Sequence, residues 1–472
     1  MIGHSIRTWR CQMTISTALP ALALAVLVSA CSSFSHTNIQ QADGAPGESR
    51  ATFDISADRP GSDPDTLMIL ALSGGGSRAA YLSASVMLRL EEVFAQDGIN
   101  LLHEVDAISS VSGGSLPAAY YVISADGEPG AYGRVWDRDT VQELMRKDYI
   151  RRWFGNWFWP TNIGKFWFTA YDRSDIMAQT FADNLFDNLN SLPPGRDLKI
   201  GQLLESRPYL VLNSTNGTAT PPPEQAGEPE PADPARNFGA RFTFTDRDFG
   251  AIDSDINDYS LARAVMATAT FPAVFNYMTL QDYRHSGTAA CDNRDCFVHV
   301  FDGGNADNLG LESVAGMLDE LPCQAGNYDR LVVILVDAYT NNSGIDSAKA
   351  DPRAGLDFFV DTNFLDATDS LLSANRGEKL EHFREDFSGR CSDPSRAVFY
   401  HIQFADIREE PLNHRLNRIK TDFKISNEDA GYIDEAVAKL LTPQNTCLSE
   451  IRDLLVDGQH QGEPLCTYTV PD

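Results

Sequence analysis

Three short polar stretches of the chain carry residue types that could perform acyl chemistry. Residues 109–115 read SSVSGGS, and their small side chains suit a sharp turn that presents the hydroxyl of Ser112. Residues 73–78 read SGGGSR, a glycine-rich loop whose backbone can approach an anion. Residues 302–304 read DGG and supply the carboxylate of Asp302. A nucleophile, an anion site and a base are the parts that ester hydrolysis requires.

Taken singly, each stretch has a more ordinary explanation. SSVSGGS could be a Ser/Gly-rich loop, and an Asp-Gly pair usually marks a turn. Gly74, Gly76 and Ala79 satisfy the dinucleotide pattern G-x-G-x-x-G/A, but Asp106 opens the next strand where that pattern needs an acid closing it. A phosphate-binding P-loop is excluded because no Lys-Ser or Lys-Thr follows. The chemical interpretation therefore depends on the three stretches acting together.

The elements around these stretches predict a strand ahead of each one. Residues 67–72, LMILAL, form the continuous apolar run of a parallel strand buried on both faces, and a helical pattern follows over 79–94. Pro117 is tolerated only in a first helical turn, so a helix must begin near Gly114 or Ser115. Further apolar strands alternate with helices. We therefore expect an α/β fold with a mainly parallel central sheet flanked by helices, and functional loops at the strand C-termini.

In this order, the three stretches resemble those of the patatin-like phospholipase family. They are similar to its G-G-G-x-R oxyanion loop, its G-x-S-x-G nucleophile turn and its D-G-G/A base motif, and residues 261–275 resemble its Ala-rich helix. The resemblance covers roughly residues 65–337 and implies a three-layer patatin-like architecture. Two positions depart from the pattern: Ser110 replaces the first glycine of the turn, and Thr268 or Thr270 stands where serine is usual.

The resemblance implies a serine acyl hydrolase that cleaves membrane-lipid esters, of phospholipase A or lysophospholipase type. Ser112 would attack the ester and Asp302 would act as its base, which requires a desolvated carboxylate with a raised pKa. Arg78 would support the glycine loop, and no metal or cofactor is needed. The implied oxyanion hole consists of backbone amides at Gly74, Gly75, Gly76 and Gly113.

Two other classes of protein remain open at this point. One is an α/β-hydrolase with a Ser-His-Asp triad, in which Asp302 or Asp337 would pair with a histidine. The candidate histidines are His382, His401 and His414, and none lies in a recognisable motif. The other is a noncatalytic lipoprotein that binds lipid or a partner. The presence of all three motifs argues against the second class.

The N-terminus predicts export and a lipid anchor. Arg7 and Arg10 precede an apolar run over 18–28, so residues 1–30 are expected to be a signal peptide. The ending VSAC resembles a bacterial lipobox, which would leave Cys31 as the lipidated first residue. Ser32 in the next position resembles outer-membrane sorting. We expect a lipid-anchored protein of the bacterial cell envelope, located in its outer membrane, with a flexible tether over 31–64 and a single domain over 65–472.

Charge and aromatic residues restrict the binding partners. The net charge of −28 disfavours nucleic-acid binding and, in general, contact with anionic membranes. Membrane contact must then come from the anchor or from a local apolar patch. Four of the six tryptophans, Trp153, Trp157, Trp159 and Trp167, lie in one short aromatic stretch. That stretch is interpreted either as core or as a surface that contacts lipid.

Apart from Cys11 and Cys31, the chain has six cysteines, and this even number predicts disulfides in an exported chain. The suggested pairs are Cys291 with Cys296, Cys447 with Cys466, and Cys323 with Cys391, although spacing does not fix the connectivity. No paired spacing typical of a zinc site occurs. Residues at about 216–236 are rich in Pro, Glu and Ala and predict a disordered insertion, and a helical extension is expected at the C-terminus.

Overall fold

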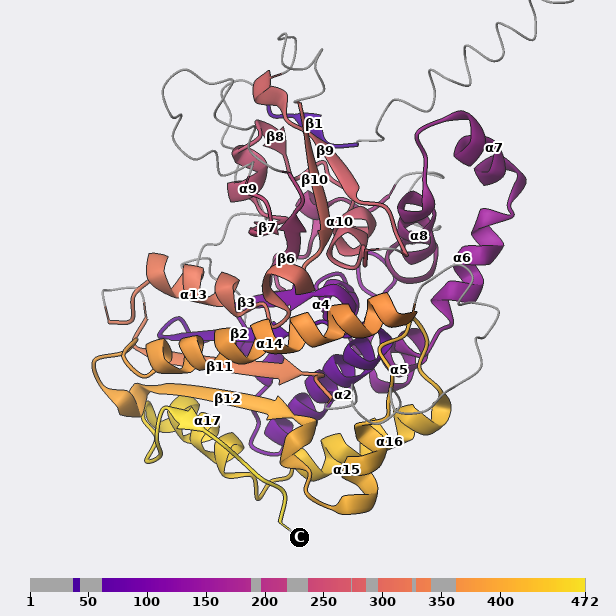
Figure 1. The fold of residues 1–472 in the computed structure, drawn as a ribbon. Helices are drawn as coiled ribbons and strands as arrows, with labels where there is room; N and C mark the ends of the chain where they lie inside the picture. Colours follow the sequence, from indigo (N-terminus) through magenta and orange to yellow (C-terminus); the bar gives the residue numbers. More distant parts are fainter. Residues whose placement is uncertain are drawn as a thin grey trace, which may run out of the picture.

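A nine-stranded sheet organises the chain (Figure 1). The computed structural model describes residues 37–42, 62–187, 197–218, 237–285 without 273, 296–340 without 325–327, and 362–471, with the backbone alone for 362–374. The strand order is β13-β12-β11-β2-β3-β6-β10-β9, with β7 also paired to β6. The strands are β2 (Thr66–Leu72), β3 (Ala107–Val111), β6 (Tyr209–Asn216), β7 (Arg241–Thr243), β9 (Met278–Gln281), β10 (Phe297–Asp302), β11 (Arg330–Asp337), β12 (Ala397–Gln403) and β13 (Leu465–Cys466).

Most of the sheet is parallel, as the sequence predicts. Every neighbouring pair from β13 through β12, β11, β2 and β3 to β6 is parallel. Beyond β6 the direction changes, because β7 and β10 run antiparallel to β6 and β9 runs antiparallel to β10. The parallel core thus ends in an antiparallel edge, and this edge includes the strand that carries Asp302.

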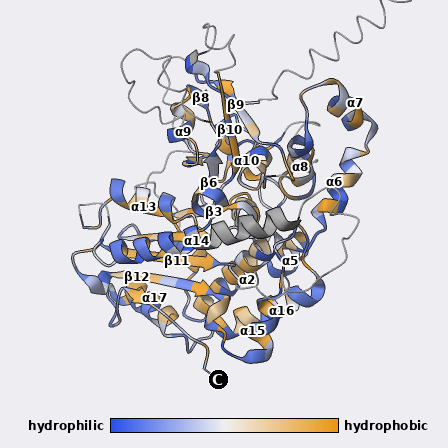
Figure 2. Cartoon of the chain, viewed as in Figure 1, coloured by the Kyte–Doolittle hydropathy of each residue, from blue (hydrophilic) through white to orange (hydrophobic). Residues whose placement is uncertain are grey.

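The continuous apolar runs are explained by burial on both faces of the sheet. In β2, Leu67 and Ile69 face one hydrophobic cluster, whereas Met68 and Leu70 face the other. Strand β11 alternates in the same way between the two clusters. Hydrophobic residues accordingly dominate β11 in Figure 2, while the helices around it mix both kinds. Alternating side chains therefore serve two separate cores.

Helices cover both faces and complete three layers. Helices α13 (Leu311–Glu320) and α14 (Thr362–Phe387) pack on one cluster through residues such as Val314 and Phe383. The other cluster is larger. It includes side chains from α2 (Gly76–Ala95), α4 (Ser115–Tyr121), α5 (Arg138–Met145), α8 (Arg173–Phe181), α10 (Leu261–Thr268), α16 (Asn427–Leu440) and α17 (Thr446–Asp457).

The structure corrects the tether predicted over 31–64. Strand β1 (Ile39–Gln40) pairs with β8 (Ser254–Asp255), and the Asn38 side chain is buried, donating to Ser254 Oγ at 3.0 Å. Near the other end of the predicted tether, Asp63 accepts from Arg330 at 2.7 Å. These long-range contacts fix both places to the fold. Residues 1–36 and 43–61, which include the predicted signal peptide and Cys31, lie outside the described residues.

Other boundaries also shift. Strand β6 continues through Asn216, so an insertion cannot begin there, and 219–236 lies outside the described residues. Within residues 134–150, β5 (Val135–Trp136) comes first and is followed by α5, which ends at Met145. Within the described ranges, no helix is both long and apolar enough to cross a membrane.

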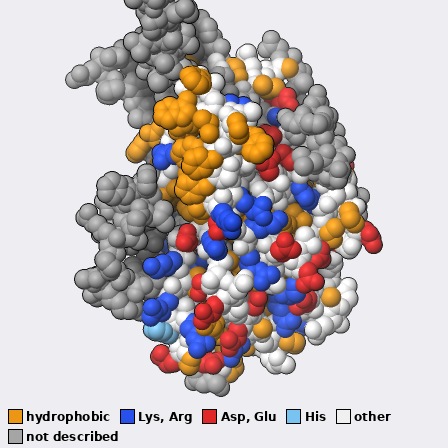
Figure 3. Space-filling model, turned by 90° about the vertical axis from the view of Figure 1, so that its right-hand side faces the viewer, with side chains coloured by type: hydrophobic (Ala, Val, Ile, Leu, Met, Phe, Trp, Pro, Cys, Tyr) orange, Lys and Arg blue, Asp and Glu red, His pale blue; other side chains and the backbone are white. Residues whose placement is uncertain are grey.

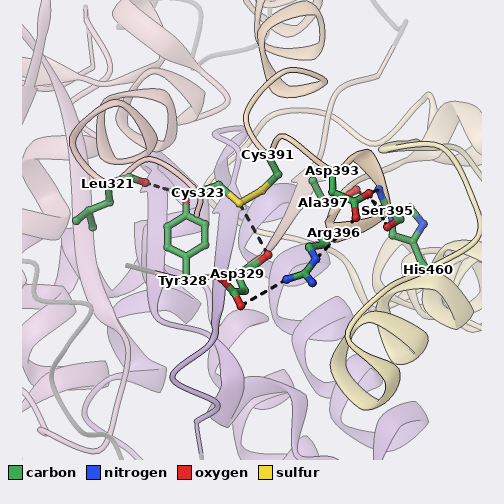
Figure 4. Close-up of a disulfide and its surroundings, with 10 residues drawn as sticks. All are labelled: Leu321, Cys323, Tyr328, Asp329, Cys391, Asp393, Ser395, Arg396, Ala397 and His460. Atoms are coloured by element: carbon green, nitrogen blue, oxygen red, sulfur yellow. Dashed lines mark hydrogen bonds and ion pairs between the residues drawn. A yellow bond between two sulfur atoms is a disulfide. The ribbon is translucent and has the colours of Figure 1, made fainter. Parts of the chain in front are cut away.

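Two of the three suggested disulfides are confirmed. Cys323 bonds to Cys391, and Cys447 bonds to Cys466. The first joins the segment after α13 to the segment before β12, where Tyr328 donates to the Leu321 carbonyl at 2.8 Å (Figure 4). Cys296 is also in a disulfide, but Cys291, its suggested partner, lies outside the described residues.

Candidate active site

Ser112 lies on a strained turn between β3 and α4. Strand β3 ends at Val111, a single 3₁₀ turn covers Ser112–Gly114, and α4 begins at Ser115 as predicted. Ser112 has a φ of 48°, in the left-handed region that residues with a Cβ rarely occupy. Such strain is what a nucleophile turn between a strand and a helix needs to present its hydroxyl.

Two glycines let this turn pack against the glycine-rich loop. A Cβ on Gly113 would lie 1.9 Å from the Gly76 carbonyl oxygen, and one on Gly114 would lie 2.6 Å from the Ser73 carbonyl oxygen. Both contacts are with backbone atoms, whose displacement would cost more free energy than a change of side-chain rotamer. The two loops are therefore in direct contact, and a side chain at either glycine would push them apart.

Ser112 is hydrogen-bonded to Asp302. The hydroxyl donates to Oδ2 of Asp302 at 2.9 Å, and the amide of Gly304 donates to Oδ1 at 2.8 Å. Burial raises the pKa of Asp302 to about 6, even though these two hydrogen bonds favour its charged form. A carboxylate with such a pKa is a much better proton acceptor than an ordinary surface aspartate.

The antiparallel direction of β10 brings Asp302 to this position. Val111 of β3 pairs with Asn213 of β6, and β6 continues for three residues beyond that row. Strand β10 runs back along this overhang and ends with Asp302 opposite Ser214. Its last residue therefore lies one row beyond the end of β3, beside the turn that carries Ser112.

The Ala-rich helix α10 holds the DGG motif in place. The amide of Asp302 donates to the carbonyl of Thr270 at 3.2 Å, and the amide of Gly303 donates to that of Thr268 at 3.1 Å. From β6, the hydroxyl of Thr215 donates to the Asp302 carbonyl at 2.8 Å. A Cβ on Gly303 would lie 2.2 Å from the Asn213 carbonyl oxygen, so this close fit requires glycine.

The glycine-rich loop adopts conformations that favour glycine. Gly75 has a φ of 137° and Gly76 a φ of 59°. The expectation that the Gly74 amide belongs to the oxyanion hole needs correction, because that amide donates to the Asn308 carbonyl at 2.9 Å. Gly74 instead provides space, since a Cβ there would lie 2.2 Å from Oδ1 of Asn308.

Arg78 is a buried brace for this loop. Its side chain is 7% exposed, and its guanidinium donates to Thr340 Oγ1 at 3.1 Å and to the Ile419 carbonyl at 2.5 Å. Nearby, the amide of Ser77 donates to the Asp422 carbonyl at 2.7 Å. Residues 419–422, far along the chain, therefore contact the loop directly.

Two asparagines that sequence reasoning missed connect the site. Asn213, 1% exposed, donates to Ser109 Oγ at 3.0 Å and to the Ser110 carbonyl at 2.9 Å, which fixes the strand beneath the turn. Asn308 packs closely on both Gly74 and Gly304, because a Cβ at these positions would lie 2.2 Å and 2.9 Å from its Oδ1. A polar residue closing the apolar run at 209–213 was the one available signal for Asn213.

Ser110 fits its position although the family pattern has glycine there. The side chain is fully buried, and its hydroxyl lies 3.4 Å from the Val211 carbonyl oxygen. The hydrogen bond that Asn213 makes to this residue goes to its backbone carbonyl. Any small residue can supply that carbonyl, so the substitution leaves the support of the turn intact.

The candidate histidines lie away from Ser112. His401 Nε2 lies 3.0 Å from Asp337 Oδ2, in a buried cluster with Arg376. Although burial opposes its charge, His401 and Arg376 hold the pKa of Asp337 well below its usual value. His382 belongs to α14 and His414 to α15 (Glu410–Leu416). Within the described part of the chain, no hydrogen bond joins Ser112 to a histidine, and no His, Cys, Asp and Glu cluster could hold a metal ion.

The aromatic stretch forms two helices, α6 (Tyr149–Trp157) and α7 (Pro160–Phe168). The expectation of lipid contact needs correction for Trp153, which is buried and donates to the Arg173 carbonyl at 3.0 Å. Trp157 is half-buried against the core. Trp159 and Trp167 are 63% and 67% exposed, so the stretch is part core and part surface.

A cavity of about 680 Å³ opens beside the DGG motif. Thr270 and Phe301 line it. The carbonyl of Thr270 accepts a hydrogen bond from the amide of Asp302, and Phe301 directly precedes Asp302 in the chain. Phe238 and Tyr277 contribute apolar walls, and Arg173, the first residue of α8, also lines the cavity. Neither Ser112 nor Asp302 lines the cavity itself, so it adjoins the dyad without enclosing it.

Comparisons with known proteins identify the family of this chain. A solved structure similar to this chain is VipD from Legionella pneumophila, with 11% identity and a TM-score of 0.29 over 80% of this chain and 67% of that chain. No curated protein matches. The model of the family described as patatin-like phospholipase matches residues 70–315, which include all three motifs and more than half of the 472 residues. This chain therefore belongs to the patatin-like phospholipase family, whose members are lipid hydrolases.

Proposed function

We propose that the protein is a serine acyl hydrolase that cleaves ester bonds of membrane lipids, of phospholipase A or lysophospholipase type. The observation that supports it most is the hydrogen bond of 2.9 Å from Ser112 Oγ to Oδ2 of Asp302. The carboxylate is buried and has its pKa raised to about 6, and the serine lies on a strained turn. This combination is suited to a nucleophile and its general base.

In the proposed reaction, Ser112 Oγ bonds to the ester carbonyl carbon while its proton passes to Asp302 Oδ2. The tetrahedral intermediate then collapses, the bond to the leaving alcohol breaks, and Asp302 returns the proton to that alcohol. Water attacks the acyl-enzyme in the reverse sense, giving its proton to Asp302, and the fatty acid leaves as Ser112 regains a proton. The scheme balances without a metal or a cofactor.

The negative oxygen of each intermediate is held by backbone amides of Gly75, Gly76 and Gly113. Contact between the Gly76 carbonyl and Gly113 keeps the two loops together, so these donors belong to one fixed unit. Donors that are already in place stabilise the transition state without reorganisation. Arg78 acts on this unit as a positioning residue.

The substrate and location are proposed from the surroundings of the site. The cavity beside Asp302 has room for part of an apolar chain, and its walls include Phe238, Tyr277 and Phe301. Lipidation of Cys31 would anchor the protein in the bacterial envelope, and in its outer membrane if Ser32 acts as a sorting signal. Both the membrane substrate and the anchor then lie at one interface.

Substitution of the dyad tests the mechanism. We expect the full chain to hydrolyse a short-chain p-nitrophenyl ester without added calcium. Ser112→Ala and Asp302→Asn should each lower kcat by at least about a thousandfold, because each removes a group that acts on the reacting atoms. A fluorophosphonate should label Ser112, and mass spectrometry of products from a native lipid extract should identify the ester that is cleaved.

Matched variants exclude nonspecific effects. Ser388→Ala and Asp393→Asn change an exposed serine and an exposed aspartate and should leave the rate unchanged. If Asp302→Asn kept full activity and a variant of His382, His401 or His414 lost it, the result would indicate a Ser-His-Asp triad and not a Ser-Asp dyad. A folded protein that neither reacts with the fluorophosphonate nor cleaves any ester would be a binding protein.

A further inference from the structure

The strongest concentration of exposed apolar side chains outside the site lies on α6 and α7. Six of the ten exposed large hydrophobic residues of the described chain are here: Phe154, Phe158, Trp159, Ile163, Trp167 and Phe168. Figure 3 shows hydrophobic side chains gathered on the face to which these helices belong, with Lys and Arg side chains next to them. We call residues 149–168, which form α6, α7 and the two residues between them, the aromatic hairpin.

The hairpin is a fixed platform whose inner half is part of the core. Trp153 packs on Phe275 at a ring-centroid distance of 5.6 Å and on Trp157 at 4.9 Å. Asn162, 2% exposed, donates to the Asn156 carbonyl at 2.9 Å and to Gln179 of α8 at 3.1 Å. These contacts hold the two helices in place through their inward side chains.

The charge around the hairpin is opposite to that of the whole chain. Residues 146–173 contain six cationic and two acidic residues, a local balance of +4 in a chain whose net charge is −28. Arg151, Arg152 and Lys165 are exposed within the hairpin itself. At physiological ionic strength, charges are screened beyond about 8 Å, so a surface that touches the hairpin is governed by these cations.

We propose that the aromatic hairpin docks on an anionic lipid surface, with the outward rings entering the interface and the cations binding the headgroups. Indole and phenyl rings are favoured at that depth, and each nearby cation adds to the attraction. Two copies related by a twofold axis at this hairpin would instead bring the cationic residues face to face. A lipid surface is therefore the occupant that matches both the apolar and the charged parts.

Docking in this orientation would present lipid to the candidate site, and in this respect the inference rests on the proposed function. The chain passes from α7 directly to Ala170 and Arg173, which line the cavity beside Asp302. Tyr277, 55% exposed, also lines that cavity. The docking face and the cavity are thus continuous along the chain.

Vesicle binding by the full chain tests the inference. All proteins carry Cys31→Ser, so lipidation cannot contribute, and their identical N-termini make differences between variants attributable to the hairpin. Binding to vesicles of phosphatidylcholine with phosphatidylglycerol should fall roughly tenfold or more in Phe158→Ser/Trp167→Ser. Arg151→Gln/Arg152→Gln should lower it by about fivefold per removed charge, with little effect on phosphatidylcholine alone.

Controls separate docking from catalysis and folding. Val456→Ser and Arg247→Gln alter exposed residues of α17 and α9 (Asp246–Gly250) and should bind like the parent. The hairpin variants should hydrolyse a soluble p-nitrophenyl ester at the parent rate but lose activity on vesicles, and Ser112→Ala should still bind vesicles. Unchanged vesicle binding in the hairpin variants would overturn the inference, as would concentration-dependent dimers that those variants abolish. Whether Ser112→Ala loses activity on the soluble ester tests the dyad separately from docking.

Discussion

Asp302 is the residue whose environment decides the chemistry. Its carboxylate is 6% exposed and is met by the hydroxyl of Ser112 and the amide of Gly304. Burial disfavours the charge, and the two donors only partly compensate, which leaves the pKa at about 6. A base with this pKa is ionised at neutral pH and still accepts a proton readily.

The rate of ester hydrolysis should therefore follow the ionisation of Asp302. We expect kcat/KM to be flat above pH 7 and to fall about tenfold per pH unit well below pH 6, because the protonated carboxyl cannot accept the proton of Ser112. The measurement is a pH profile with a soluble p-nitrophenyl ester. A profile that stays flat down to pH 4.5 would show that a group with a lower pKa acts as the base.

The stability of Asp302→Asn is an independent check of the same pKa. The folded pKa of about 6 lies above the ordinary aspartate value of 3.8, so between these values the folded state binds more protons and the free energy of unfolding decreases as pH rises. Above pH 6, keeping the buried carboxylate charged lowers the free energy of unfolding by on the order of 2–3 kcal/mol. Asp302→Asn should thus be more stable than the parent at pH 8, with a difference that shrinks towards pH 4 in urea unfolding.

At the scale of elements, the glycine-rich loop is held by a segment outside the match to the family model. Ser77 donates to the Asp422 carbonyl, and Arg78 donates to the Ile419 carbonyl, both from the C-terminal part of the chain. A Cβ on Gly76 would lie 2.4 Å from the same Asp422 carbonyl. The segment at 419–422 therefore fixes the position of the proposed oxyanion donors.

Gly76→Ala should accordingly impair catalysis more than stability. The new Cβ must displace backbone at Asp422 and would sit at a φ of 59°, so we expect kcat to fall by roughly a hundredfold as the amides move. Gly431→Ala in α16 is the matched control, because no atom lies within 4 Å of its added Cβ. Equal rates for the two variants in the soluble ester assay would remove this loop from the mechanism.

At the scale of the whole molecule, two disulfides close loops in the second half of the chain. The bonded cysteines are separated by 68 residues for Cys323 with Cys391 and by 19 for Cys447 with Cys466. The second bond joins α17 to β13, the last strand of the sheet. Cross-links of these lengths restrict the unfolded chain more than the folded one.

Replacing each pair by serines should lower the free energy of unfolding, and slightly more for the longer loop. The expected losses are about 4 kcal/mol for Cys323 with Cys391 and about 3 kcal/mol for Cys447 with Cys466. Urea unfolding with and without a reductant measures these losses. In each double variant, the reductant should lower the free energy of unfolding less than in the parent, because one disulfide is already absent. If reduction leaves the parent unchanged, the bonds do not contribute to the stability of the fold.

The sequence by itself determined the local parts of this protein. Continuous apolar runs predicted the buried parallel strands, Pro117 placed the start of α4, and the three motifs indicated the nucleophile turn, the glycine loop and the carboxylate. These features depend on neighbouring residues, because burial periodicity, proline geometry and glycine spacing are local properties. The same reasoning failed for Asn38 and Asp63, which bond to Ser254 and Arg330, each more than 200 residues away.

Only the tertiary structure decided how those parts meet. Periodicity reports that 297–301 is a strand but not its direction, and it is the antiparallel pairing of β10 with β6 that ends Asp302 beside Ser112. Two other sets of contacts are likewise long-range. The Gly74 amide donates to the Asn308 carbonyl, and residues 419–422 accept hydrogen bonds from the glycine loop. Pairing direction and contacts across hundreds of residues are set by packing of the whole sheet, which no local pattern encodes.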